Sequence, residues 1–209
     1  MKRYLQETRF AASSLIEIIW SDFAKLEVID AQLKVLTNEF EFKRQVFLAN
    51  EFHPAANHYH AQAAQAYAGM SESKIEFENK VHGLTESIEA KSASISALSG
   101  AILQLAKQCI SLRYGRPQNA PDGPDVDGIS VKEIIWEGRN QSIHYENPKE
   151  ISDGVVGLFK RLDASRNDGV VWNPRSQINF AFEVVSFLGW STYENYERHM
   201  NLIGAKKGH

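Results

Sequence analysis

A long run of apolar residues spaced three and four apart constrains the fold more than any other feature of this sequence. The run continues for about seven helical turns, and its members are Leu15, Ile19, Phe23, Leu26, Ile29, Leu33, Leu36 and Phe40. This spacing predicts one amphipathic helix over roughly residues 5–49. No segment shows the strict alternation of a strand, except for a short hairpin expected near GVVWNPRSQ, residues 169–177.

Two further helices are expected between Pro54 and Tyr114. The alanine-rich stretch AANHYHAQAAQAYAGM predicts a second helix that ends near Gly69. A third long helix begins after GMSES, and the small residues in its middle would let another helix approach closely. Residues 114–130 contain three prolines and three glycines, which predict a loop.

The second half of the chain predicts shorter helices. Ser130 and Glu133 have the spacing of a capping box, so VKEIIWEGRNQSIHY should be helical up to the stop at Asn147 and Pro148. One helix is expected after Pro148 and a last one over QINFAFEVVSFLGWSTYENYERHM, whose aromatic residues belong in the core or in a subunit interface.

The predicted fold class is therefore all-α. We expect an up-and-down bundle of about five to six helices with long N-terminal helices. Residues 1–68 could form a separate arm, but no composition shift marks a linker, so a single domain over residues 1–209 is predicted.

The bulk composition limits the classes of partner. The 209 residues carry a formal net charge of -3 at pH 7, which argues against a broad basic surface that coats nucleic acid. The single cysteine, Cys109, lies in an apolar run and is expected to be a buried thiol, consistent with a reducing cytoplasm. The N-terminus lacks the apolar core of a signal peptide and no membrane span is expected, so a cytoplasmic location is predicted.

The candidate metal sites are weak. His58 and His60 are two residues apart, whereas metal-binding helices place histidines at i and i+4, so we interpret these and His53 as surface or capping residues. The acidic loop DGPDVDG does not put carboxylates at the first and last positions of a calcium loop. No metal and no cofactor is therefore predicted.

The most informative motif is EGRNQSIHYENP, residues 137–148. Arg139, Asn140 and His144 fall at the end of the helix predicted from residue 131. Helix ends expose polar side chains, while Ile134 and Ile135 would hold the preceding turn in the core. A rigid helix end that presents an arginine, an amide and a histidine suits catalysis.

RNQSIH resembles the signature of the HEPN superfamily, in which an arginine, often followed by a polar residue, precedes a histidine by four to six residues. Arg139, Asn140 and His144 match those positions, and the resemblance is strong over residues 131–165. It implies a metal-independent endoribonuclease, often a toxin or phage-defence effector, that acts on RNA as a homodimer. A neutralising antitoxin protein is a further expectation.

The sequence departs from one HEPN pattern. Toxins silenced by a nucleotidyltransferase carry the modified tyrosine two residues after the histidine, where this chain has Glu146. Tyr145 lies one residue earlier, so that partner is not predicted. Tyr145 remains a weak candidate for RNA binding together with Arg113 and Arg116, and Lys160, Arg161 and the AKKGH tail could extend a local positive rim.

Side-chain chemistry is consistent with this activity. A histidine can take a proton from a ribose 2'-hydroxyl or give one to the departing 5'-oxygen, and an arginine can bind the scissile phosphate. Because a five-residue step turns a helix by about 140°, Arg139 and His144 share a face only if the helix is distorted, for which Gly138 offers a place. A two-fold dimer would instead supply both an acid and a base in one cleft.

The alternative is a non-catalytic helical binding or regulatory module of the same fold. In that case Arg139 would form an internal ion pair, with Glu137 or Glu146, and His144 would be a satisfied histidine at a helix end.

Overall fold

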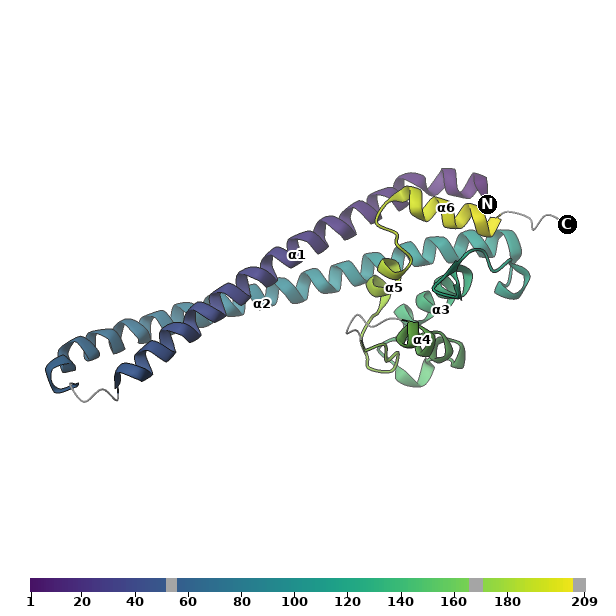
Figure 1. Cartoon of the computed structure of the whole chain (residues 1–209). Coiled ribbons are helices and arrows are strands. Elements are labelled where there is room, and N and C mark those ends of the chain that lie inside the picture. The colour runs from purple at the N-terminus through teal and green to yellow at the C-terminus, as the bar shows by residue number, and fades with distance from the viewer. Residues whose placement is uncertain (52–55, 166–170, 205–209) are drawn as a thin grey trace. The chain divides into compact units, whose positions relative to one another are not determined.

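The computed structural model describes residues 1–51, 56–165 and 171–204, without the side chains of residues 43, 46–51 and 56–73 (Figure 1). The chain divides into two compact units, which are described separately below. Unit 1 contains Met1–Asp22 and Ser94–His209, and unit 2 contains Phe23–Ala93. This division into two units does not test the prediction that residues 1–209 form a single domain, which stays a prediction.

The described part of the chain is almost entirely helical, which confirms the all-α bundle. Two 3-10 turns, η1 and η2, and one two-stranded hairpin connect the helices. The elements are α1 (Lys2–Glu51), α2 (Ala56–Tyr114), η1 (Pro117–Asn119), β1 (Asp125–Val126), β2 (Ile129–Ser130), α3 (Val131–His144), η2 (Pro148–Glu150), α4 (Asp153–Ser165), α5 (Ala181–Phe187) and α6 (Tyr193–Gly204).

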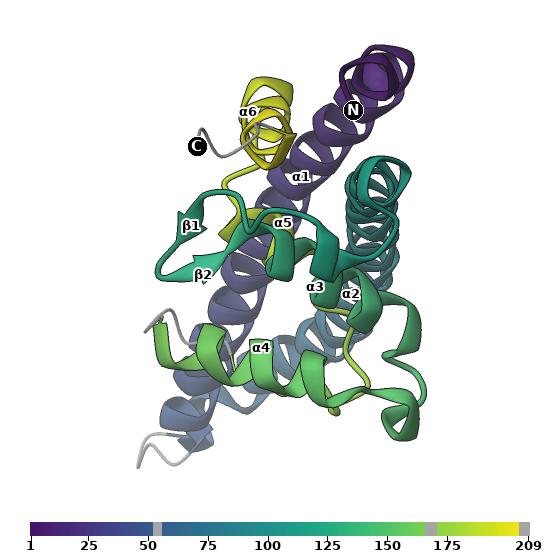
Figure 2. The same ribbon diagram turned by 90° about the vertical axis from the view of Figure 1, so that its right-hand side faces the viewer.

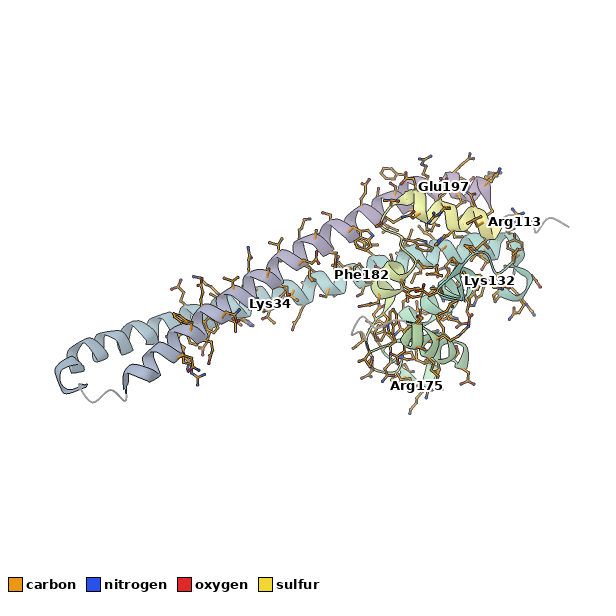
Figure 3. The ribbon with its side chains drawn as sticks, viewed as in Figure 1. Lys34, Arg113, Lys132, Arg175, Phe182 and Glu197 are labelled. Atoms are coloured by element: carbon orange, nitrogen blue, oxygen red, sulfur yellow. The ribbon has the colours of Figure 1, made fainter. Side chains whose placement is uncertain are left out.

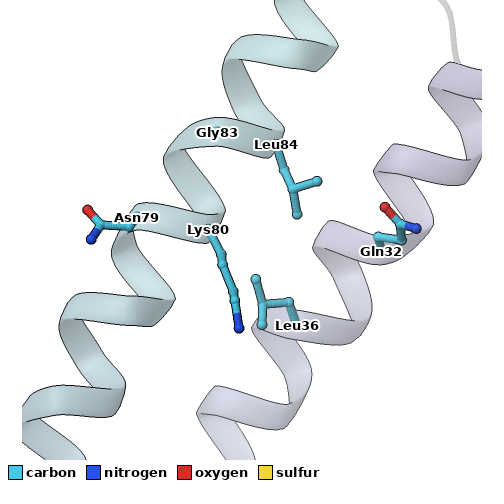
Figure 4. Close-up of a pocket in the computed structure, with 6 residues that line it drawn as sticks. All are labelled: Gln32, Leu36, Asn79, Lys80, Gly83 and Leu84. Atoms are coloured by element: carbon cyan, nitrogen blue, oxygen red, sulfur yellow. The ribbon is translucent and has the colours of Figure 1, made fainter.

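Unit 2 is a pair of antiparallel helical segments from α1 and α2. The rings of Phe40 and Phe77 stack with their centroids 4.0 Å apart. About one turn before Phe40 along α1, Leu36 points toward Leu84 of α2 across a groove of about 420 Å³ (Figure 4). Phe40 and Leu36 belong to the apolar run in the sequence, so within unit 2 these members of the run face α2, as the helical spacing predicts.

The predicted break between a second and a third helix near Gly69 is wrong, because α2 is continuous over 59 residues. A glycine inside a helix costs only about 1 kcal/mol relative to alanine. No proline occurs between Pro54 and Pro117, so nothing stronger interrupts the helix. Within the residues that the structure describes, one helical stretch, Lys74–Tyr114, is long and apolar enough to cross a membrane. Core helices of soluble proteins meet the same criteria of length and composition.

The core of unit 1 lies where α3 packs against both α4 and α5 (Figure 2). Phe159 of α4 meets Trp172 and Phe180 at edge-to-face angles, with centroids 5.7 and 5.5 Å away. Buried apolar side chains from α2 complete this core, among them Ile102, Leu103, Ala106, Cys109 and Ile110. The buried Cys109 thiol is as predicted, and burial raises its pKa to about 11.

The loop predicted over residues 114–130 contains the hairpin of β1 and β2. The hairpin expected over residues 169–177 is not found in the described part of that stretch, residues 171–177, which contains no strand. Asp127 and Gly128 have φ angles of 50° and 78°, and Val126 pairs with Ile129 across them. Two successive residues with positive φ are typical of the type I′ turn, for which Asp-Gly is a favoured sequence.

The last predicted helix is two helices, because the chain turns at Gly189. Gly189 has a φ of 66° and donates its N–H to the Ser186 carbonyl, while Trp190 donates to the Val185 carbonyl. This pair of bonds is the Schellman motif, which ends a helix at a residue in the left-handed region. The expected aromatic core is confirmed for Phe180, Phe187 and Trp190, which are buried. Phe182, expected there too, is only half-buried, with its ring 5.6 Å from that of Trp20.

The start of α3 is as predicted, but the capping box is not formed. Ser130 makes no side-chain bond to the first turn of α3 and donates its hydroxyl to the Asp122 carbonyl instead. The Glu133 carboxylate forms an ion pair with Arg161 of α4. Loop and interhelix contacts therefore replace the local cap.

Candidate functional site

The motif residues lie in the last turn and a half of α3. The helix ends at His144, with Tyr145 as its C-cap, as the sequence predicts. Asn147 accepts a hydrogen bond from the Lys149 N–H, and Pro148 opens η2. The chain therefore reverses immediately after His144, which brings η2 back beside the helix end.

Arg139 lies against α2. Its Nε donates to Gln104 Oε1, and the half-buried position lowers the pKa of the guanidinium through loss of solvation. Among the described residues, neither Glu137 nor Glu146 forms the ion pair with Arg139 that the non-catalytic alternative predicts. Glu137 accepts from Asn140, and Glu146 accepts from the Tyr145 hydroxyl. The charge of Arg139 is therefore met by a neutral amide.

Asn140 connects α3 to a lysine that the sequence did not single out. Lys107 Nζ of α2 donates to Asn140 Oδ1 over 2.9 Å, and Asn140 Nδ2 donates to Glu137 Oε2 over 3.2 Å. The Lys107 ammonium also lies 4.4 Å from the centroid of the Trp136 ring, within reach of a cation–π contact. Burial, and then the charge of Arg139, lower the pKa of Lys107, while Glu137 opposes them.

We call Gln104, Lys107, Trp136, Arg139 and Asn140 the α2–α3 polar cluster. Gln104 and Lys107 are three residues apart and so lie on one face of α2. They are two of the polar residues that interrupt the apolar stretch AILQLAKQCISL. That contrast was the available signal, but it did not identify which helix the two residues would meet.

His144 is held by a carboxylate from η2. Its Nδ1 lies 2.8 Å from Glu150 Oε2, and Asn147 Nδ2 donates to the other carboxylate oxygen, also over 2.8 Å. An ionised carboxylate only accepts, so Nδ1 carries the proton. Within the described part of the chain, Nε2 has no hydrogen-bond partner, and 38% of the side chain is exposed. The arrangement fixes Nδ1 and leaves the second ring nitrogen open, which suits proton transfer.

Within one chain, the structure does not bring Arg139 and His144 to the same face. Arg139 contacts α2, whereas His144 contacts η2. The place for a distortion that Gly138 offered is not used to interrupt the helix, because α3 is continuous through it. A Cβ at Gly138 would lie 2.7 Å from Cγ1 of Val184, so the glycine permits the close approach of α5.

The weaker candidates for RNA binding lie outside the α2–α3 polar cluster. Arg113 is at the C-terminal end of α2, 5.3 Å from the centroid of the Tyr114 ring, while Lys132 marks the start of α3 (Figure 3). Arg113 Nη1 also lies 3.9 Å from where a Cβ on Gly204 of α6 would be. Arg116 is exposed beside η1.

The other elements of the predicted positive rim differ in their surroundings. The Arg161 charge is paired with Glu133, and Lys160 is exposed on α4. The Tyr145 hydroxyl donates to Glu146 Oε1 over 3.0 Å, and that bond is the main reason why the pKa of Tyr145 is raised. The AKKGH tail lies outside the described residues.

The side chains of the three histidines that were weighed as metal ligands, His53, His58 and His60, also lie outside the described part of the chain. Among the side chains that are described, no group of three or more His, Cys, Asp and Glu residues is placed to hold a metal ion.

The chain matches no family model, no curated protein and no solved structure.

Proposed function

We propose that this protein is a metal-independent endoribonuclease of HEPN type, with Arg139, Asn140 and His144 as its site. The observation that supports this most is the environment of His144. The Glu150 carboxylate fixes one ring nitrogen, and the other nitrogen has no hydrogen-bond partner among the described residues, on a side chain that is 38% exposed. An oriented, accessible imidazole can remove a proton from a 2'-hydroxyl or protonate a 5'-oxygen.

Arg139 supplies the complementary charge. A guanidinium has five N–H donors, and Gln104 uses only the one on Nε. The remaining donors form a planar fork that matches a phosphate. Because no carboxylate pairs with Arg139 in the described part of the chain, a substrate phosphate would not have to displace one.

The separation of Arg139 and His144 on different sides of α3 supports a homodimer. A five-residue step turns a helix by about 140° and advances it by about 7.5 Å, so Arg139 and His144 of one chain point to different sides of α3. A two-fold contact at the ends of α3 would place Arg139 of one chain near His144 of the other. Ile143 lies between them in sequence with 50% of its surface exposed, and such a contact would cover it.

The expected reaction is transesterification. The ribose 2'-hydroxyl loses its proton to one histidine and attacks the adjacent phosphorus, while the P–O5' bond breaks and the departing oxygen gains a proton from the second histidine. The products are a 2',3'-cyclic phosphate and a 5'-hydroxyl. Unpaired RNA would be the substrate, because its 2'-hydroxyl and bases are accessible. A role as a toxin or phage-defence effector in the cytoplasm, with an antitoxin protein as partner, belongs to the same proposal.

The test is cleavage of single-stranded RNA in the presence of a metal chelator. His144→Ala should lower the rate by about 10²–10⁴, and Arg139→Ala by about 10²–10³. His82→Ala and Arg3→Ala are matched controls, because each side chain is exposed and paired with a glutamate one turn away. Equal cleavage by all five proteins would identify a contaminating nuclease and refute the proposal.

The non-catalytic module remains the second candidate, because the Arg139–Gln104 and His144–Glu150 contacts also tie elements together. A purely structural His144 predicts that His144→Ala lowers the free energy of unfolding in a protein that never cleaves RNA. Unfolding in urea, measured on the same variants, therefore separates the two candidates.

A further inference from the structure

The α2–α3 polar cluster brings together two cations from different helices. Lys107 and Arg139 are both half-buried, and the charge of Arg139 contributes to lowering the pKa of Lys107. Holding two like charges together away from water costs free energy in the unliganded protein. An anion bound between them would remove that cost.

The nearby carboxylate does not neutralise both cations. Glu137 accepts a hydrogen bond from Asn140, and its Oε1 lies 2.9 Å from where a Cβ on Gly154 would be. Gly154 is in the first turn of α4, and the N-terminus of a helix itself stabilises a negative charge. One carboxylate shared in this way leaves a net positive charge on the α2 side of α3.

The donors of the two cations are only partly used. Arg139 donates through Nε to Gln104, and Lys107 donates to Asn140. No other hydrogen-bond acceptor for either cation lies among the described residues. The half-exposed Trp136 ring supports the Lys107 ammonium from one side, which limits its motion.

We propose that Lys107 is a second cationic anchor beside Arg139, and that together they bind a phosphate group through its non-bridging oxygens. Asn140 then acts as a positioning residue, because its side-chain oxygen directs the ammonium of Lys107. The identification of that phosphate as part of an RNA backbone rests on the proposed function; the oxyanion site itself does not.

The first experiment titrates the full chain with inorganic phosphate and follows tryptophan fluorescence. Lys107 contacts the Trp136 ring, so phosphate should change the emission of the wild type in a saturable way, and Trp136→Phe should lose the response. Lys107→Met should abolish the response as well, whereas Lys107→Arg, which keeps the charge, should restore part of it. Lys34→Met is the matched control, because Lys34 pairs with Asp30 in unit 2.

The second experiment measures binding of a 2'-O-methyl RNA, which cannot be cleaved by transesterification, as a function of salt concentration. Loss of one phosphate contact should reduce the slope of log K against log [salt] by about 0.7 for a single strand. We expect that reduction for Lys107→Met and no change for Lys34→Met. A lysine that only supports the fold would lower thermal stability and leave the slope unchanged.

The outcomes separate this inference from the proposed function. A phosphate response that depends on Lys107, in a protein that does not cleave RNA, would support the oxyanion site and refute the nuclease. RNA cleavage that needs His144, together with wild-type phosphate response and salt slope in Lys107→Met, would support the nuclease and overturn the role of Lys107. No phosphate response in the wild type would also overturn it.

Discussion

Replacing Gly138 with alanine tests how α3 is held in place beside the motif. A Cβ at this position would lie 2.7 Å from Cγ1 and 3.3 Å from Cγ2 of Val184, which is fully buried on α5. Alanine is favoured over glycine in a helix by about 1 kcal/mol. Forcing a methyl group into a packed core costs about 1–3 kcal/mol. We therefore expect Gly138→Ala to lower the free energy of unfolding by about 1 kcal/mol, although it improves helix propensity.

The clash can be separated from the propensity by a double-mutant cycle. Val184→Ala alone removes two buried methyl groups and should cost about 2–3 kcal/mol, from lost burial and the cavity. In the double variant the new methyl group enters that cavity, and the helix keeps its gain in propensity. The double variant should therefore be more stable than the sum of the single effects predicts, by about 2 kcal/mol.

Urea unfolding followed by circular dichroism measures all four proteins of the cycle. Gly138→Ala that is neutral or stabilising, with additive effects in the double variant, would contradict the close approach of α3 and α5. It would also return Gly138 to the role expected from the sequence, in which the glycine gives the helix freedom to bend near Arg139.

Two further predictions concern titratable groups inside unit 1. Trp190 Nε1 donates to His199 Nδ1, which requires a neutral ring, and burial followed by the charge of Arg198 lowers the pKa of His199. The contribution of the neutral His199 ring to stability should be present above its ordinary pKa of 6.5 and lost as pH falls through the lowered pKa. In urea unfolding between pH 8 and pH 5, the free energy of unfolding should therefore fall more steeply with decreasing pH for the wild type than for His199→Gln. Burial raises the pKa of Glu183, whose Oε2 is buried without a hydrogen-bond partner, so the charged form costs stability as pH rises through that pKa. Glu183→Gln should add about 1 kcal/mol at pH 8 and less toward pH 4; a gain that does not vary with pH would point to a cause other than the charge.

The sequence was sufficient for the elements whose local signals agree with their packing. The apolar run between Leu15 and Phe40 predicts α1, and within unit 2 its member Phe40 stacks on Phe77 of α2. The end of α3 is equally local, since Asn147 and Pro148 stop a helix through their own side chains. Such signals depend on neighbours in sequence, so no tertiary information is needed to interpret them.

The errors in the predicted fold come from glycines, because a glycine can lie inside a helix, form a turn or end a helix. Gly69 lies inside α2, Gly128 forms part of a hairpin turn, and Gly189 ends α5 in the left-handed region. Only the backbone angle distinguishes these roles, and it depends on what the flanking residues contact. Asp127 before Gly128 was the one local signal that would have located the hairpin.

The residues of the candidate site also fall into those that local sequence identifies and those that only tertiary packing reveals. Arg139, Asn140 and His144 were identified from their spacing within one helix. Gln104 and Lys107 lie more than thirty residues earlier, and only the packing of α2 on α3 brings them to the motif. Glu150 lies beyond Pro148, where a tight 3-10 turn returns it to His144.

Arg139 and His144 keep hydrogen-bonding groups that no contact among the described residues uses. If Arg139 served only to join α3 to α2, an apolar side chain would do so without the cost of holding a cation half-buried, or a carboxylate in place of Gln104 would compensate the charge. The structure has neither, and it adds Lys107 to the same place. At the other end of the motif, Glu150 occupies one nitrogen of His144 and leaves the second open. Contacts that only stabilised the helix end would gain nothing from unused guanidinium donors or from a ring nitrogen without a partner. Binding a phosphate and moving a proton would require both.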